Sequence, residues 1–206
     1  MTIKKFTFGP FGTNTYVVSE GETAMLVDCA CWDMADQEEL EAYLQRAGLT
    51  PTLLVCTHGH LDHLWGAKWA CEKWGLTAYV HPNDFTQIEN LARQQASFGI
   101  LPRDTEFPYG DITKVIPFEG STEARNTSPF KGVRGVFTPG HTQGSVCLYN
   151  EAEGVLLSGD TWFDGGYGRT DLPGGNYMQL MQSLERLAKL PSGTWVLPGH
   201  GGEFRV

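Results

Sequence analysis

The chain has 206 residues, of which 41% are hydrophobic and 19% are charged. This composition is typical of a globular protein with a sizeable core, and it excludes an intrinsically disordered chain. The formal net charge of −9 disfavours a nucleic-acid-binding surface, because such surfaces depend on clustered lysine and arginine. We therefore expect a single domain spanning residues 1–206 and no nucleic-acid partner.

The sequence also indicates where the protein resides. No apolar run approaches the ~18 residues needed to cross a bilayer, and the first residues lack the apolar core of a signal peptide. The five cysteines are an odd number scattered through apolar stretches, which indicates reduced thiols. We expect a cytoplasmic protein without membrane contact, and the oligomeric state stays open.

In the first third of the chain, β-branched and apolar residues between glycine-containing turns predict strands at 15–19 and 24–27, joined as a hairpin. An apolar run at 52–57 predicts a buried strand that leads directly into His58. Between them, helical spacing of apolar residues predicts a helix that stops at Gly48. Its apolar stripe consists of Leu40, Tyr43, Leu44 and Ala47.

The rest of the chain continues this mixture of strands and helices. The same patterns predict helices at 64–74, 82–97 and around 180–187, and strands at 77–80, 135–138, 145–149, 155–158 and, as the last strand, 194–197. The polar stretch 119–132 is interpreted as a surface loop. Strands and helices in this proportion predict an α/β fold of four layers, αββα, with two sheets packed together and helices outside.

A cluster of chemically active residues follows the strand at 52–57. The motif THGHLDH at 57–63 places three imidazoles and one carboxylate within six residues. Imidazole and carboxylate groups are the usual ligands of zinc and similar divalent metals, and a tight turn lets them converge. The motif predicts part of a metal site.

Three later motifs, each following an apolar strand, supply further ligands. They are TPGHTQG with His141, SGD with Asp160 and PGHGG with His200. Loops at strand ends of a sandwich can meet at one edge, so the joint pattern predicts that these residues join the first cluster. His81 is the one histidine outside the pattern, and a structural role is the favoured interpretation for it.

The motifs THGHLDH, TPGHTQG, LLSGD and LPGHG stand in the order, and at similar intervals, of those in the metallo-β-lactamase superfamily. Within it, the chain resembles the glyoxalase II-like hydrolases, and GYGRTDLPGGN at 166–176 resembles their shorter bacterial branch, the hydroxyacylglutathione hydrolase-like proteins. The resemblance covers nearly the whole chain. It implies the αββα fold of that superfamily.

The resemblance also implies a site for two divalent ions, with zinc expected and iron or manganese as alternatives. A hydroxide that bridges the ions would be the nucleophile. Asp62 and Asp160 would be the catalytic carboxylates. The implied ligands are His58, His60 and His141 at the first metal, Asp62, His63 and His200 at the second, and Asp160 bridging both.

Other residues receive roles only through the resemblance. Asp28, in LVD, resembles the family's aspartate beneath the metal loops, where it would orient ligands; the alternative is a turn former. Arg169 lies where glyoxalase II enzymes carry a basic residue near the substrate, so it is a candidate substrate contact. The alternative is that Arg169 is a solvated surface charge. Tyr167 is a candidate for lining the substrate entrance near Arg169, and the alternative is a packing residue. Cys29 and Cys31 form a CxC pair that we interpret as buried packing residues rather than a redox pair or metal site.

The implied activity is hydrolysis of a small-molecule thioester such as a hydroxyacylglutathione, and lactone or β-lactam hydrolysis are variants. The helical domain that supplies glutathione contacts in longer relatives is not expected within residues 1–206. One alternative is a persulfide dioxygenase-like enzyme with one iron held by His58, His60 and His141, or by these with Asp160. Another is a non-enzymatic binding module. The presence of Asp62, His63 and His200 favours the hydrolase.

Overall fold

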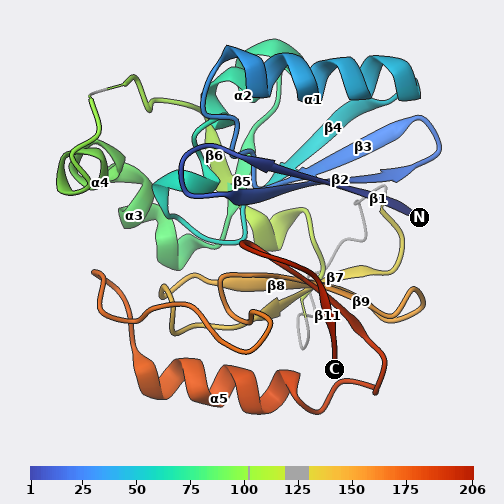
Figure 1. Cartoon of the computed structure of the whole chain (residues 1–206), viewed down its shortest axis with the longest axis vertical. Helices are drawn as coiled ribbons and strands as arrows, with labels where there is room; N and C mark the ends of the chain where they lie inside the picture. Colours follow the sequence, from blue (N-terminus) through green and yellow to red (C-terminus); the bar gives the residue numbers. More distant parts are fainter. Residues whose placement is uncertain (102, 119–129) are drawn as a thin grey trace.

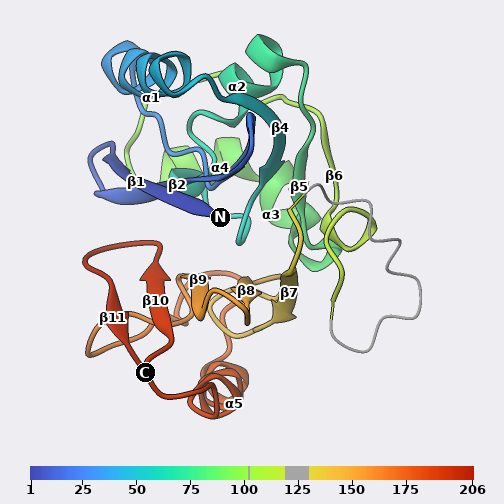
Figure 2. The same cartoon turned by 90° about the vertical axis from the view of Figure 1, so that its right-hand side faces the viewer.

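The computed structural model describes residues 1–101, 103–118 and 130–206. Two sheets lie face to face, with α1 (Met34–Ala47) and α2 (Ala67–Trp74) over the first sheet and α5 (Tyr177–Leu187) beneath the second (Figure 1). Figure 2 shows the same layers from the side, with the second sheet between the first sheet and α5. The predicted αββα sandwich is confirmed.

The first sheet combines an antiparallel and a parallel part. The first three of its strands run antiparallel, whereas β3 to β6 run parallel and need crossover connections such as α1. In the described part of the chain its strands, in spatial order, are β1 (Thr2–Phe8), β2 (Thr13–Glu20), β3 (Thr23–Val27), β4 (Thr50–Val55), β5 (Ala78–Val80) and β6 (Tyr109–Asp111).

The second sheet is antiparallel except for one pair. Strands β9 and β10 run parallel because α5 connects them across the outer face. Among the described residues the order is β11–β10–β9–β8–β7. These strands are β7 (Val133–Phe137), β8 (Val146–Asn150), β9 (Val155–Gly159), β10 (Trp195–Pro198) and β11 (Phe204–Arg205).

Both faces of the central strand β3 are buried, which explains its continuous apolar run. On β3, Met25 and Val27 point between the sheets, where they pack with Leu148 of β8. Leu26 points the other way and packs with Leu40 of α1. Of the predicted stripe of α1, Leu40 and Leu44 are buried and Tyr43 is partly buried, whereas Ala47 is exposed. Gly48 ends the helix in the left-handed conformation, as predicted.

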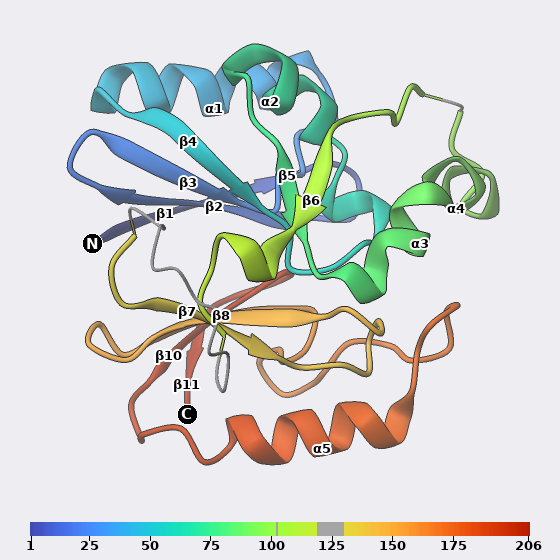
Figure 3. The same cartoon turned by 180° about the vertical axis from the view of Figure 1, so that it is seen from behind.

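The predicted helix at 82–97 is wrong as a single helix. The structure has a 3₁₀ turn η2 (Pro82–Asp84), then α3 (Phe85–Glu89) and α4 (Leu91–Ser97), which project at one end of the sandwich (Figure 3). The break lies at Asn90, whose amide donates to the Thr86 carbonyl at 2.7 Å and whose backbone leaves helical geometry. Such a side chain competes with the backbone for hydrogen bonds.

Other boundaries also differ from the predictions. The helix predicted at 64–74 begins only at Ala67, because the metal-ligand motif forms a 3₁₀ turn η1 (Leu61–His63) before it. Strands β1, β6 and β11 were not predicted, and β10 is therefore not the last strand. Of the predicted loop at 119–132, residues 119–129 lie outside the described part, and Phe130 is buried rather than on the surface.

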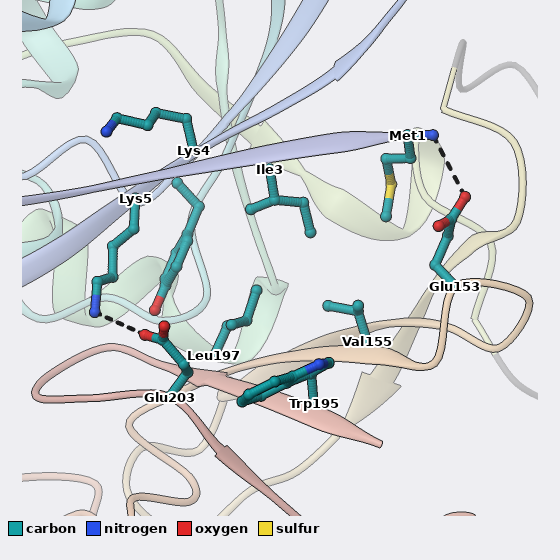
Figure 4. Close-up of a pocket in the computed structure, with 10 residues that line it drawn as sticks. Met1, Ile3, Lys4, Lys5, Glu153, Val155, Trp195, Leu197 and Glu203 are labelled. Atoms are coloured by element: carbon teal, nitrogen blue, oxygen red, sulfur yellow. Dashed lines mark hydrogen bonds and ion pairs between the residues drawn. The ribbon is translucent and has the colours of Figure 1, made fainter. Parts of the chain in front are cut away.

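No helix in the described part of the chain combines the length and the apolar character needed to cross a membrane. A cavity of about 550 Å³ lies between β1 and β10. Ile3 of β1 points across it towards Leu197 and Val155 of the second sheet, and ion pairs lie at its two ends (Figure 4). These pairs join Lys5 to Glu203 and the amino terminus to Glu153.

Hydrogen bonds from β2 join the two sheets near the site described below. The buried hydroxyl of Tyr16 on β2 donates to the carbonyl of Pro198 at the end of β10, at 2.7 Å. Replacing Tyr16 by Phe should lower the free energy of unfolding by about 1 kcal/mol, because the carbonyl keeps a second donor in Asn14. Urea denaturation measures this change. Tyr43→Phe is the matched control, and equal effects of the two variants would contradict the prediction.

Candidate metal centre

The ends of four strands bring the predicted ligand residues together. His58, His60, Asp62 and His63 follow β4 of the first sheet. The second sheet contributes the rest: His141 lies between β7 and β8, Asp160 follows β9, and His200 follows β10. All seven side chains meet in one cluster between the two layers, so loops from both sheets build the site.

The cluster contains three overlapping groups that could hold a metal ion. Within each group, the potential ligand atoms all lie within 4.8 Å of one another. Two residues, His58 and His63, belong to more than one group, which places the groups side by side. The groups are His58, His60 and His141; His58, His63 and Asp160; and Asp62, His63 and His200.

Three buried atoms of this cluster have no hydrogen-bond partner within the described structure. They are Nε2 of His58, Nε2 of His63 and Oδ1 of Asp160. An unpaired buried polar atom costs about 1–3 kcal/mol. Atoms of this kind are explained when a cation accepts their lone pairs, and the donor set of imidazole and carboxylate suits a divalent metal. The residues therefore fit the metal site that the sequence predicts.

Asp28 holds the first ligand loop from beneath. Its carboxylate accepts the Thr57 backbone N–H and hydroxyl, both at 2.7 Å, and lies 2.8 Å from Nδ1 of His63. The Thr57 oxygen in turn lies 3.0 Å from Nδ1 of His58. Protons on both Nδ1 atoms satisfy this network and leave each Nε2 free for a metal. Asp28 takes φ of 56°, the one positive φ among described non-glycine residues.

Two backbone carbonyls orient two further imidazoles. Nδ1 of His141 lies 2.7 Å from the carbonyl oxygen of Arg169, and Nδ1 of His200 lies 3.1 Å from that of Phe11. Because a carbonyl only accepts, each Nδ1 carries the proton and each Nε2 is available as a ligand. Arg169 thus contributes to the site through its backbone.

The buried environment keeps two imidazoles neutral. Burial, together with the neighbouring imidazole of His63, lowers the pKa of His58 well below its ordinary value. Burial, reinforced by His141, lowers the pKa of His60 to about 3. Both rings are neutral near pH 7, which is the state that binds a metal.

The carboxylates, in contrast, are charged. Burial acts against ionisation of Asp62, but His63 beside it lowers the pKa of that carboxyl to about 2. The pKa of Asp160 is also held well below its usual range, with burial opposed by His63 and His200. Burial opposes protonation of His63 and His200, but Asp62 and Asp160 raise the pKa of both imidazoles. The two buried carboxylates therefore draw positive charge into the site.

Asp84 is a residue of this site that the sequence did not predict. Its carboxylate is fully buried and accepts the Gly59 N–H at 2.9 Å, the Gly144 N–H at 2.7 Å and the Thr142 hydroxyl at 2.6 Å. It therefore ties the loop of His58–His63 to the loop of His141. The only sequence signal is a carboxylate beside Pro82 after a strand, which is equally typical of a helix start.

Two glycines permit close approach of backbone to the ligands. A Cβ at Gly199 would lie 2.2 Å from Oδ1 of Asp160, and one at Gly168 would lie 2.7 Å from Nδ1 of His141. No side chain fits at these distances, so glycine is required where the last ligand loop and the Arg169 loop pass the site.

The remaining predicted residues lie around the site with different roles. A cavity of about 700 Å³ opens beside His60 and is lined in part by Arg169. Tyr167 is outside the residues that line this cavity; it is exposed, with its ring 6.3 Å from that of Tyr177. Cys29 and Cys31 are free and buried, and they belong to none of the possible metal groups in the described structure.

The sequence model of the family described as the Metallo-beta-lactamase superfamily matches residues 8–200. The chain belongs to this superfamily. The match covers every residue of the candidate metal centre, so the cluster is built from the region that defines the family.

Three members or relatives of the superfamily illustrate the similarity. The "Probable metallo-hydrolase YqgX" of Bacillus subtilis is 33% identical over 100% of this chain and 93% of its own length. The "Hydroxyacylglutathione hydrolase GloC" of Haemophilus influenzae is 29% identical over 81% of this chain and 76% of its own length. The crystal structure of TTHA1623 in a di-iron-bound form is 31% identical, with a TM-score of 0.83 over 98% of this chain and 94% of that one.

Replacing Asp84 by Asn should weaken metal binding roughly ten- to a hundredfold, because the amide cannot accept all the bonds that join the two ligand loops. Competition with a chelator of known affinity measures the change. Asp104→Asn, an exposed carboxylate away from the site, is the control. Equal metal affinity of the Asp84 variant and the wild type would contradict a positioning role.

Replacing Gly199 by Ala should abolish most metal binding, because the new Cβ occupies the place of the Asp160 carboxylate. Gly202→Ala, three residues along the same loop, meets nothing within 4 Å and should retain the metal. Elemental analysis of the two purified variants decides between them. Full metal content in both would show that the loop can move aside at no cost.

Proposed function

We propose that the protein is a metal-dependent hydrolase of small-molecule thioesters that works with two divalent ions. One observation carries the proposal: seven ligand side chains converge, and three of their buried atoms have no partner in the described part of the chain. A merely structural cluster would leave these atoms paired within the protein.

The geometry of Asp160 supports two adjacent ions rather than one. Its Oδ1 lies 3.3 Å from Nε2 of His63, and its Oδ2 lies 3.5 Å from Nε2 of His141. One carboxylate thus faces both ligand groups. We assign the first ion to His58, His60 and His141, the second to Asp62, His63 and His200, and Asp160 to both.

Two such ions, when bound, would lower the pKa of a water molecule and polarise the substrate carbonyl. The protein supplies the arrangement around them. Asp28 fixes His63, and the Thr13 hydroxyl donates to Oδ2 of Asp62 at 2.8 Å, so that each ligand keeps one orientation. The cavity beside His60 gives the substrate carbonyl access to the cluster.

The similarity to the hydroxyacylglutathione hydrolase of Haemophilus influenzae supports thioesters as the substrate class. The di-iron form of TTHA1623 supports a two-metal site in a protein whose structure matches 98% of this chain, and it makes iron a candidate beside zinc. The oxygenase alternative needs one iron at the first group alone. The complete second group favours the hydrolase over it.

The decisive experiment measures metal content per chain, by elemental analysis of protein purified without added metal, together with hydrolysis of S-lactoylglutathione. About two ions per chain with thioester turnover would support the proposal. About one iron per chain, with oxygen consumption and no thioester turnover, would replace it with the oxygenase.

Replacing Asp160 by Ala should lower metal content to about one ion or fewer and thioester hydrolysis by at least about a hundredfold, since both ligand groups lose a shared carboxylate. His81→Ala is the control, because His81 stacks on Phe137 with ring centroids 4.5 Å apart and lies outside the cluster. Unchanged metal content and unchanged thioester hydrolysis in the Asp160 variant would contradict the two-metal assignment.

A further inference from the structure

The cavity beside the metal centre has walls from two layers of the fold. One wall is formed by α3 and α4, and the other by residues 169–174, which precede α5. Figures 1 and 3 both show α4 and this segment at the same end of the sandwich. His60 lies in the lining, so a molecule in the cavity reaches the metal ligands directly.

The charge of this cavity is unusual for the protein. Its described lining contains two arginines, Arg93 and Arg169, and no carboxylate, in a chain of net charge −9. Arg169 is already neutralised, since its Nε and Nη2 donate to the two oxygens of Asp171 at 2.7 and 2.6 Å. The guanidinium of Arg93 has no hydrogen-bond or ion-pair partner among the described residues.

The neighbouring residue Gln94 fixes the backbone position of Arg93 relative to the metal centre. The Gln94 side chain accepts the Leu61 N–H at 2.9 Å and donates to the Gly59 carbonyl at 3.1 Å. Both partners belong to the loop that carries His58–His63. Helix α4 is therefore attached to the ligand loop itself, so the backbone of Arg93 has a set place at the wall of the cavity.

Amide side chains that line the cavity form hydrogen bonds with its opposite wall. Gln87 donates to the Pro173 carbonyl at 2.5 Å, and Gln143 donates to the Gly174 carbonyl at 2.7 Å. These bonds hold the opposite wall in place. Arg93 is consequently the charged donor of the cavity lining that is left to bind a molecule in the cavity.

We propose that Arg93 is a specificity residue that binds a carboxylate of the substrate inside this cavity. The substrate class is then a thioester that carries a carboxylate apart from its reacting bond. A guanidinium matches a carboxylate with two parallel N–H donors, so the interaction is directional as well as charged. The reacting bond in this inference rests on the proposed function, whereas the anion site rests on the cavity alone.

The test compares two thioesters that differ only in a carboxylate or its primary amide. In Arg93→Gln, KM for the carboxylate substrate should rise about tenfold with kcat within about twofold, and KM for the amide substrate should stay unchanged. Arg93→Lys should raise KM for the carboxylate substrate less than Arg93→Gln does. Arg46→Gln, an exposed arginine on α1, is the matched control, and thermal unfolding checks that each variant is folded.

A binding measurement separates this inference from the proposed function. Calorimetry would use an unreactive thioether with the same carboxylate and its amide counterpart. If Arg93→Gln binds the carboxylate form more weakly and the amide form equally well, the anion site is supported. This holds even if the protein hydrolyses no thioester, in which case only the proposed function fails. Equal binding and equal KM in wild type and Arg93→Gln would overturn the role of Arg93.

Discussion

Buried ligand atoms that lack a protein partner are the constraint on which the rest of this structure depends. Nε2 of His58, Nε2 of His63 and Oδ1 of Asp160 lie away from water without a hydrogen-bond partner, at a cost that a bound cation would offset. The protein holds them there because each is carried on a short loop after a strand of a rigid sandwich. The layers, the crossovers and the packing of both sheets have one common effect, which is to bring four strand ends to the same place.

Most of the remaining polar interactions serve to orient these atoms. Asp28, the carbonyl of Arg169 and the carbonyl of Phe11 each fix the proton of one imidazole on the side away from the centre. Asp84 joins two loops that are far apart in sequence. Such outer contacts determine the geometry of a metal site nearly as much as the ligands do.

The sequence predicted what depends on local pattern and missed what depends on tertiary contact. The ligand residues were predictable because each sits in a short motif after an apolar strand, as His141 does after β7. Asp84 and Arg93 were not, because their roles arise from loops and helices that meet only in the folded chain. The helix break at Asn90 follows from a single side-chain hydrogen bond, and a two-residue strand such as β11 is too short to show a period.

The division of the ligands between the two sheets has a thermodynamic consequence. The first sheet contributes His58 to His63, and the second contributes His141, Asp160 and His200, so an ion bound by both groups links the two halves of the sandwich. A link of this kind exists only in the folded chain. With a metal bound in this way, the melting temperature would rise with the free metal concentration, and a chelator would lower it.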